Sequence, residues 1–159
     1  MKTLIIYASH AGYTRECAEK IASYLVKEAT ILDIENMAAD FNVEPYAKII
    51  IGSYVHAGRI ASKIKRFLKK YQPLISQKKI AFFLSCLSKD NFGKYLRQNI
   101  PTPLLNQALS KTHVGAAVYY EKLNPLERFM LKKITGRNQS FSVPENDNIR
   151  RFAEEIANL

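Results

Sequence analysis

Short apolar segments alternate with longer helical stretches along almost the whole of this 159-residue chain. The first segment, KTLIIYA at residues 2–8, ends at a polar turn, which is typical of a strand buried on both faces. Further strands are predicted at residues 29–34, 47–53, 79–86 and 112–120. Helices are predicted at residues 14–28, at 60–71, over 91–111 with a break at PTP, and from about Pro144. Strands separated by helices form βαβ units, so the pattern predicts a parallel sheet between two helical layers.

This alternation fits a doubly wound α/β fold with a five-stranded parallel sheet of order 2-1-3-4-5 in three α/β/α layers. We expect a single domain over residues 1–159. Ligands of this fold bind at the carboxyl ends of the strands, so the relevant loops are 9–14, 53–59, 86–92 and the segment after residue 120. Thr14 is the expected N-cap of the first helix, and Pro73 is expected to end the second.

The charge of the chain limits its classes of partner. The net charge is +10, and eight cations but no acid lie between Arg59 and Lys79. Such a surface attracts anionic lipid, nucleic acid or an acidic small molecule, although a solvated helix face explains it equally well.

No apolar run reaches the ~20 residues of a membrane span, and MKTLIIYASH does not resemble a signal peptide. A cytoplasmic protein is therefore expected.

The cysteines and histidines show no metal-ligand spacing, so no metal site is predicted. Cys17 shares a helical stripe with Ile21 and Leu25, which indicates core packing. Cys86 ends a predicted strand. Both cysteines are expected to be reduced in the cytoplasm.

The loop SHAGYT at residues 9–14 lies between the first strand and the first helix. Backbone N–H groups at a helix N-terminus favour an anion, and Gly12 permits the positive φ that turns successive amides inward. Ser9 and Thr14 add hydroxyl donors. The loop lacks the lysine of a P-loop and the three glycines of a dinucleotide site. The chain also lacks the acidic residues of a response-regulator receiver, so the pattern favours a phosphate cradle without a fixed counter-charge.

Two further loops are predicted to lie beside this cradle. GSYVHAGR (52–59) contains small residues that let the backbone approach a flat ligand, and Tyr54 can stack on such a ligand. SCLSKDNFG (85–93) is also small and polar. A site with a phosphate end and a planar end indicates flavin mononucleotide (FMN).

Three segments carry a resemblance to a known family: MKTLIIYASHAGYTRE (1–16), IIIGSYVHAGR (49–59) and LERFMLKKITG (126–136). They resemble the flavodoxin-like, menaquinone-dependent protoporphyrinogen oxidases, and the resemblance covers most of the chain. It implies an FMN-dependent oxidoreductase of heme biosynthesis that oxidises protoporphyrinogen IX and passes the electrons to a quinone. The alternatives are a flavodoxin-type electron-transfer protein, an NAD(P)H-dependent quinone or flavin reductase, and an interaction protein that has lost its flavin.

The resemblance also implies the cofactor residues. Those expected at the phosphate are Ser9, His10, Ala11, Gly12, Tyr13 and Thr14. Those expected around the ring are Ser53, Tyr54, Val55, His56, Ala57, Gly58, Ser85, Cys86, Leu87 and Ser88. Flavodoxins usually have a hydroxyl residue at the position of Ala11, so one phosphate donor is missing here. His56 is the candidate catalytic residue, because it and His10 lie in loops that converge on the cofactor and can relay a proton.

An insert at about residues 121–143 is typical of that family. Its apolar residues Leu123, Leu126, Met130 and Ile134 recur at helical spacing, and cations outnumber acids around them. Such a helix can lie at a membrane surface, cover an active site or pack on the sheet edge. Arg128, Lys132 and Lys133 are the candidates for contact with substrate carboxylates or anionic lipid. The expected partners are a tetrapyrrole, a quinone and the inner face of the cell membrane, with no nucleic acid.

Overall fold

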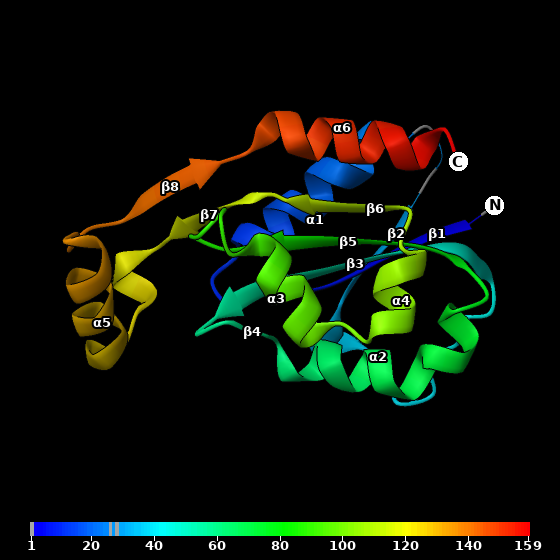
Figure 1. Cartoon of the computed structure of the whole chain (residues 1–159), viewed down its shortest axis with the longest axis horizontal. Helices are drawn as coiled ribbons and strands as arrows, with labels where there is room; N and C mark the ends of the chain where they lie inside the picture. The colour runs from blue at the N-terminus through cyan, green and yellow to red at the C-terminus, as the bar shows by residue number, and fades with distance from the viewer. Residues whose placement is uncertain (1, 26, 28) are drawn as a thin grey trace.

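A computed structural model describes residues 2–25, 27 and 29–159, and its centre is a parallel sheet (Figure 1). The order of neighbouring strands is β2-β1-β3-β5-β6. Their bounds are β1 (Lys2–Ala8), β2 (Ala29–Asp33), β3 (Tyr46–His56), β5 (Lys79–Ser85) and β6 (Ser110–His113). The short strand β4 (Arg59–Ile60) pairs only with β3 and takes no place in this order. The remaining five strands correspond to the five predicted ones, and the predicted order 2-1-3-4-5 is confirmed.

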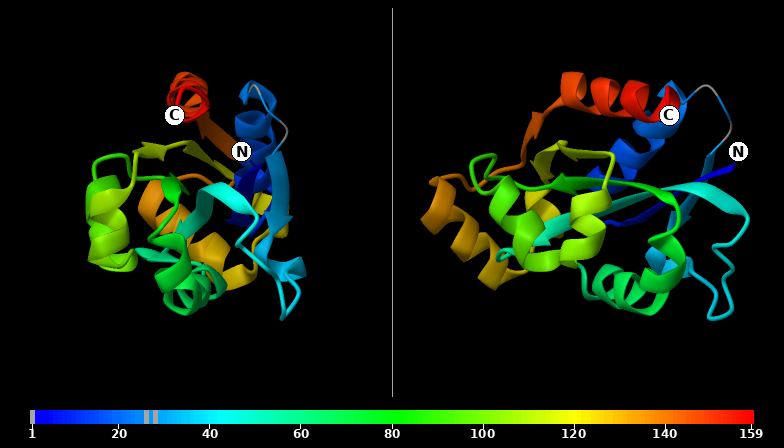
Figure 2. Two further views of the ribbon diagram at one scale, coloured as in Figure 1. Left: turned by 90° about the vertical axis from the view of Figure 1, so that its right-hand side faces the viewer. Right: turned by 45° about the vertical axis from the view of Figure 1, so that its right-hand side comes forward.

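Helices cover both faces of the sheet, as predicted (Figures 1 and 2). One face packs against α1 (Tyr13–Tyr24) and α6 (Asn146–Ala157), and the other against α2 (Ser62–Ile75), α3 (Phe92–Asn99) and α4 (Thr102–Gln107). In β1, Ile5 packs on the first side and Leu4 and Ile6 on the second, and all three are fully buried. Burying such a side chain contributes about 1.5–3 kcal/mol, which is why the strand is almost uniformly apolar.

Three helix boundaries differ from the predictions. The N-cap of α1 is Gly12, with φ 110°, whereas Thr14 lies inside the helix and is buried. The helix ends at Tyr24, and the predicted continuation to residue 28 falls partly outside the described residues. Helix α2 continues past Pro73 to Ile75, because Ile75 is fully buried and the Ser76 N–H bonds the Gln72 carbonyl.

The third strand is longer than predicted and ends in a hairpin. β3 runs to His56, and the chain returns as β4 with His56 paired to Arg59. The two turn residues, Ala57 and Gly58, have φ values of 48° and 74°, as two-residue hairpins of this hand require. The predicted loop 53–59 is therefore mostly strand.

The predicted strand 112–120 is two strands. β6 ends at His113, and β7 (Gly115–Val118) leaves the sheet to pair antiparallel with β8 (Phe141–Pro144). Between them lie the short 3₁₀ turn η2 (Tyr120–Lys122) and helix α5 (Pro125–Thr135), so the expected insert is a helix held on a two-stranded ribbon. Pro144 consequently belongs to β8 and not to the last helix. Figure 1 shows α5 beyond the carboxyl ends of the strands.

Helix α5 has strong boundary signals. Asn124 and Glu127 form a capping box, in which each side chain accepts from the other residue's backbone N–H, and Gly136 ends the helix in a left-handed conformation. Among the described residues, no helix is both long and apolar enough to cross a membrane.

Candidate functional site

The loop at residues 9–14 forms a cradle at the N-terminus of α1. The first helical hydrogen bond runs from the Glu16 N–H to the Gly12 carbonyl, so the preceding amides have no partner inside the helix. Ser9 Oγ accepts from the Gly12 N–H at 3.0 Å, which leaves the hydroxyl proton free to donate. Tyr13 has its own role: its hydroxyl donates to the Val114 carbonyl at 2.6 Å, and burial raises its pKa. The cradle therefore offers backbone donors and the Ser9 hydroxyl to an anion, and Thr14, the second predicted hydroxyl donor, lines the cleft.

The hairpin places two aromatic residues beside this cradle. The centre of the His10 ring, in the loop after β1, lies 5.6 Å from that of Tyr54 and 6.5 Å from that of His56. Nε2 of His10 is 3.6 Å from Oε1 of Glu127, which comes from α5. Loops that follow β1 and β3 thus meet, as predicted, and α5 adds a carboxylate that the sequence pattern did not assign to the site.

The loop after β5 closes another side of the site. Burial raises the pKa of the Cys86 thiol to about 11, so it is protonated at neutral pH and is no nucleophile. The Cys86 carbonyl accepts from Nε2–H of His113 at 2.8 Å, which ties this loop to the end of β6. Ser88 Oγ accepts from the Asn91 side chain, and Leu87 is half-exposed.

These loops, β7 and α5 enclose a mainly apolar cleft of about 280 Å³. The predicted residues that line it are His10, Ala11, Tyr13, Thr14, Tyr54, Val55, His56, Ala57, Ser85, Cys86 and Leu87. The residues that sequence reasoning did not assign to a cofactor site are Ala116, Ala117, Val118, Tyr119, Leu123, Glu127, Met130, Leu131 and Ile134. The sequence signal for part of this set is spacing: Glu127, Leu131 and Ile134 recur at intervals that place them on one helix face.

The other predicted residues lie around the cleft without lining it. Ser53 is buried, and its hydroxyl accepts from the Ala61 N–H and donates to the Tyr54 carbonyl. Ser9 and Gly12 shape the cradle, Gly58 completes the hairpin turn, and the Ser88 carbonyl accepts from the Cys86 thiol. The structure thus assigns Ser53 a supporting contact under the hairpin.

The three predicted cations of the insert differ in their surroundings. Arg128 donates to the Tyr120 and Glu121 carbonyls and lies over the Tyr120 ring, so it holds α5 to the preceding turn. Lys132 and Lys133 are exposed. In the part of the chain that the structure describes, no group of three or more histidine, cysteine or acidic residues is arranged for a metal ion.

Comparisons with known proteins place this site in context. The flavodoxin domain family matches residues 4–142. The whole chain is 26% identical to protoporphyrinogen IX dehydrogenase (quinone) of Escherichia coli strain K12 and aligns with 96% of that protein. It is also 26% identical to the flavodoxin-like domain-containing protein BilS of Clostridioides difficile, over 94% of this chain and 90% of BilS.

The fold is also that of flavodoxins of known structure. The Fusobacterium nucleatum flavodoxin bound to FMN matches with a TM-score of 0.59 and 14% identity, covering 99% of this chain and 97% of that one. The flavodoxin domain family supports FMN as the cofactor, and the site fits it: first-turn amides and the Ser9 hydroxyl are available at the N-terminus of α1, and Tyr54 borders the mainly apolar cleft. The chain belongs to the flavodoxin domain family.

Proposed function

We propose that this protein is an FMN-dependent oxidoreductase that oxidises protoporphyrinogen IX and delivers the electrons to a quinone. The observation that carries the proposal is the wall that α5 adds to the cleft, where Met130, Leu131 and Ile134 face the cofactor site. An electron carrier that exchanges electrons through an exposed ring edge has no need of such a wall. The full-length similarity to an E. coli enzyme of that name supports the same reading.

The residues present would hold the cofactor at both ends. The first-turn amides of α1 and the Ser9 hydroxyl would bind the phosphate, and Tyr54 with the β3–β4 hairpin would flank the ring. When bound, FMN supplies two-electron redox chemistry between a reduced substrate and a quinone. The protein itself positions the reactants and excludes water.

The histidines and Glu127 would manage protons in the cleft. Oxidation of a pyrrolic substrate releases protons, and Nε2 of His10 can accept one and share it with Oε1 of Glu127, 3.6 Å away. His56 also lines the cleft and is the second candidate proton acceptor. The Cys86 thiol, with its pKa raised to about 11, stays out of this chemistry.

Anaerobic mixing tests the proposal. The FMN-loaded protein is mixed with protoporphyrinogen IX and then with a soluble menaquinone analogue, and flavin absorbance is followed. We expect bleaching by the porphyrinogen and recovery with the quinone. If NADPH bleaches the flavin and the porphyrinogen does not, the protein is a nicotinamide-dependent reductase. If neither bleaches it while a low-potential chemical reductant does, the protein is an electron carrier.

We further propose that α5 brings the site to the cytoplasmic membrane surface, where a lipid-soluble quinone is found. Its side chains Leu126 and Phe129, which do not line the cleft, are 67% and 65% exposed, respectively. Lys132 and Lys133 lie among them and would meet anionic headgroups or the carboxylates of a tetrapyrrole.

Replacing Ala11 with serine should strengthen FMN binding. Ala11 lines the cleft in the phosphate loop and has no hydroxyl where flavodoxins usually have one. One more hydrogen bond contributes about 1 kcal/mol, so calorimetric titration should give an FMN dissociation constant about 5-fold lower for Ala11→Ser. An unchanged or higher dissociation constant would place the phosphate away from this side chain.

A further inference from the structure

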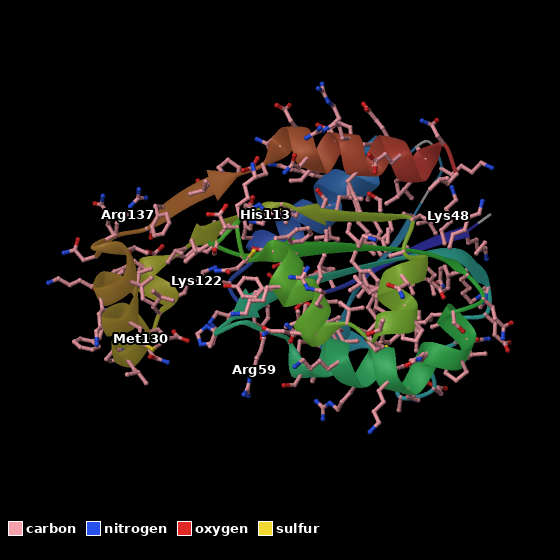
Figure 3. All side chains as sticks on the ribbon, in the orientation of Figure 1. Lys48, Arg59, His113, Lys122, Met130 and Arg137 are labelled. Atoms are coloured by element: carbon pink, nitrogen blue, oxygen red, sulfur yellow. The ribbon has the colours of Figure 1, made fainter. Side chains whose placement is uncertain are left out.

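Lys122 lies at the end of η2, between α5 and the sheet, as Figure 3 shows. Its Nζ donates to the carbonyl of Ala11 at 2.9 Å, so the ammonium group reaches across 111 positions of sequence to the phosphate loop. The same ammonium lies 4.9 Å from the centre of the Tyr119 ring. Lys122, a cation of the insert, is thus held beside the cradle at the N-terminus of α1.

The electrostatics of the cradle explain why a cation matters there. A helix N-terminus carries only about half a positive charge, whereas a phosphate monoester carries about −1.5 to −2 at neutral pH. Glu16, in the first turn of α1, accepts from the Tyr119 hydroxyl at 3.1 Å and adds negative charge on this side. Arg15 is directed to Glu19, with which it forms an ion pair at 2.9 Å. The ammonium of Lys122 therefore offsets the part of the phosphate charge that the backbone at the helix N-terminus leaves uncompensated.

We propose that Lys122 is a phosphate-binding residue that gives the FMN phosphate a charged partner and couples cofactor binding to the position of α5. The inference rests on the FMN site of the proposed function but not on its substrate. The sequence pattern predicted a cradle without a counter-charge, because Lys122 is distant from residues 9–14 along the chain. With the phosphate bound, Lys122 draws η2 toward the loop, and Arg128, through the Tyr120 and Glu121 carbonyls, carries α5 with it.

A comparison of two flavins separates this role from a merely structural one. Riboflavin has the ring of FMN but lacks the phosphate. The variant Lys122→Met keeps the apolar stem and removes the charge. A charge-assisted hydrogen bond corresponds to roughly 10- to 100-fold in affinity, so calorimetry should show FMN binding weaker by that factor and riboflavin binding changed by less than about 2-fold.

Two other variants serve as controls. Lys122→Arg keeps the charge and should retain most of the affinity for FMN. Lys69→Met removes the same charge from the exposed face of α2 and should leave both flavins unaffected. Added salt should weaken FMN binding by the wild type more than by Lys122→Met, because only the wild type has the ion pair to screen.

Two results would overturn the inference. If Lys122→Met weakens FMN and riboflavin equally, the contact with Ala11 only supports the fold of the loop. If neither dissociation constant changes, Lys122 does not reach the phosphate. Neither result bears on whether protoporphyrinogen reduces the flavin, so this inference and the proposed substrate fail separately.

As a second readout, FMN but not riboflavin should slow amide hydrogen exchange over residues 120–135, and Lys122→Met should abolish that difference.

Discussion

Replacing Gly115 with alanine should lower the free energy of unfolding by about 3 kcal/mol or more. Gly115 has a φ of 86°, which costs an L-residue about 1–2 kcal/mol. A Cβ there would also lie 2.1 Å from the Val143 carbonyl oxygen and 2.9 Å from the Glu145 nitrogen. Both are backbone atoms, one in β8 and one directly after it, so relief requires β8 to move away from β7.

Gly136→Ala is the matched control, and urea denaturation compares the two variants. Gly136 also has a positive φ, 70°, but nothing lies within 4 Å of the position of its Cβ. Only the conformational cost of about 1 kcal/mol is expected there. Equal losses in the two variants would show that the ribbon yields freely and does not hold α5 in place.

Neutralising Lys132 and Lys133 together should weaken binding to anionic vesicles about 30-fold. Each lysine near an anionic surface contributes about 1 kcal/mol, and these two lie on the exposed side of α5 with Phe129. The measurement is co-sedimentation of the Lys132→Gln/Lys133→Gln variant with vesicles that contain phosphatidylglycerol. Wild-type binding should also fall as salt is added.

The control for this measurement is Lys65→Gln/Lys69→Gln on α2, which changes the net charge equally. That helix buries Ile64, Phe67 and Leu68 against the sheet, so its basic face has little apolar surface to insert. We expect a smaller loss from the α2 variant. Equal losses would mean that the net charge of +10, and not the face of α5, governs the attraction.

The central sheet could be predicted from sequence because burial on both faces leaves a local signature. Leu4, Ile5 and Ile6 are all buried although they point to alternate faces of the sheet. The strand is therefore an uninterrupted apolar run, which can be recognised without knowing the neighbouring strands. The end of the fifth strand was not predictable in this way. Its apolar run continues through Gly115, and only pairing with β8, about 30 positions later, shows that β7 leaves the sheet.

The same distinction applies to the site. The loops after β1, β3 and β5 could be predicted, because a parallel sheet brings the carboxyl ends of its strands together. The contacts of Glu127 with His10 and of Lys122 with Ala11 could not be predicted. Helical spacing places Glu127 on a face with Leu131, but the ribbon that returns this face to the cleft depends on long-range pairing. The hydroxyl of Thr14 suits a helix cap, but the left-handed turn at Gly12 begins the helix earlier, so the cap predicted from residue type alone is wrong.

The most direct test of the account is a titration of the purified protein with FMN, followed by quenching of flavin fluorescence. The cradle, the hairpin and the wall of α5 predict one FMN per chain and saturation at micromolar concentration. Failure to bind FMN at that concentration would contradict the cofactor site and every function proposed for it.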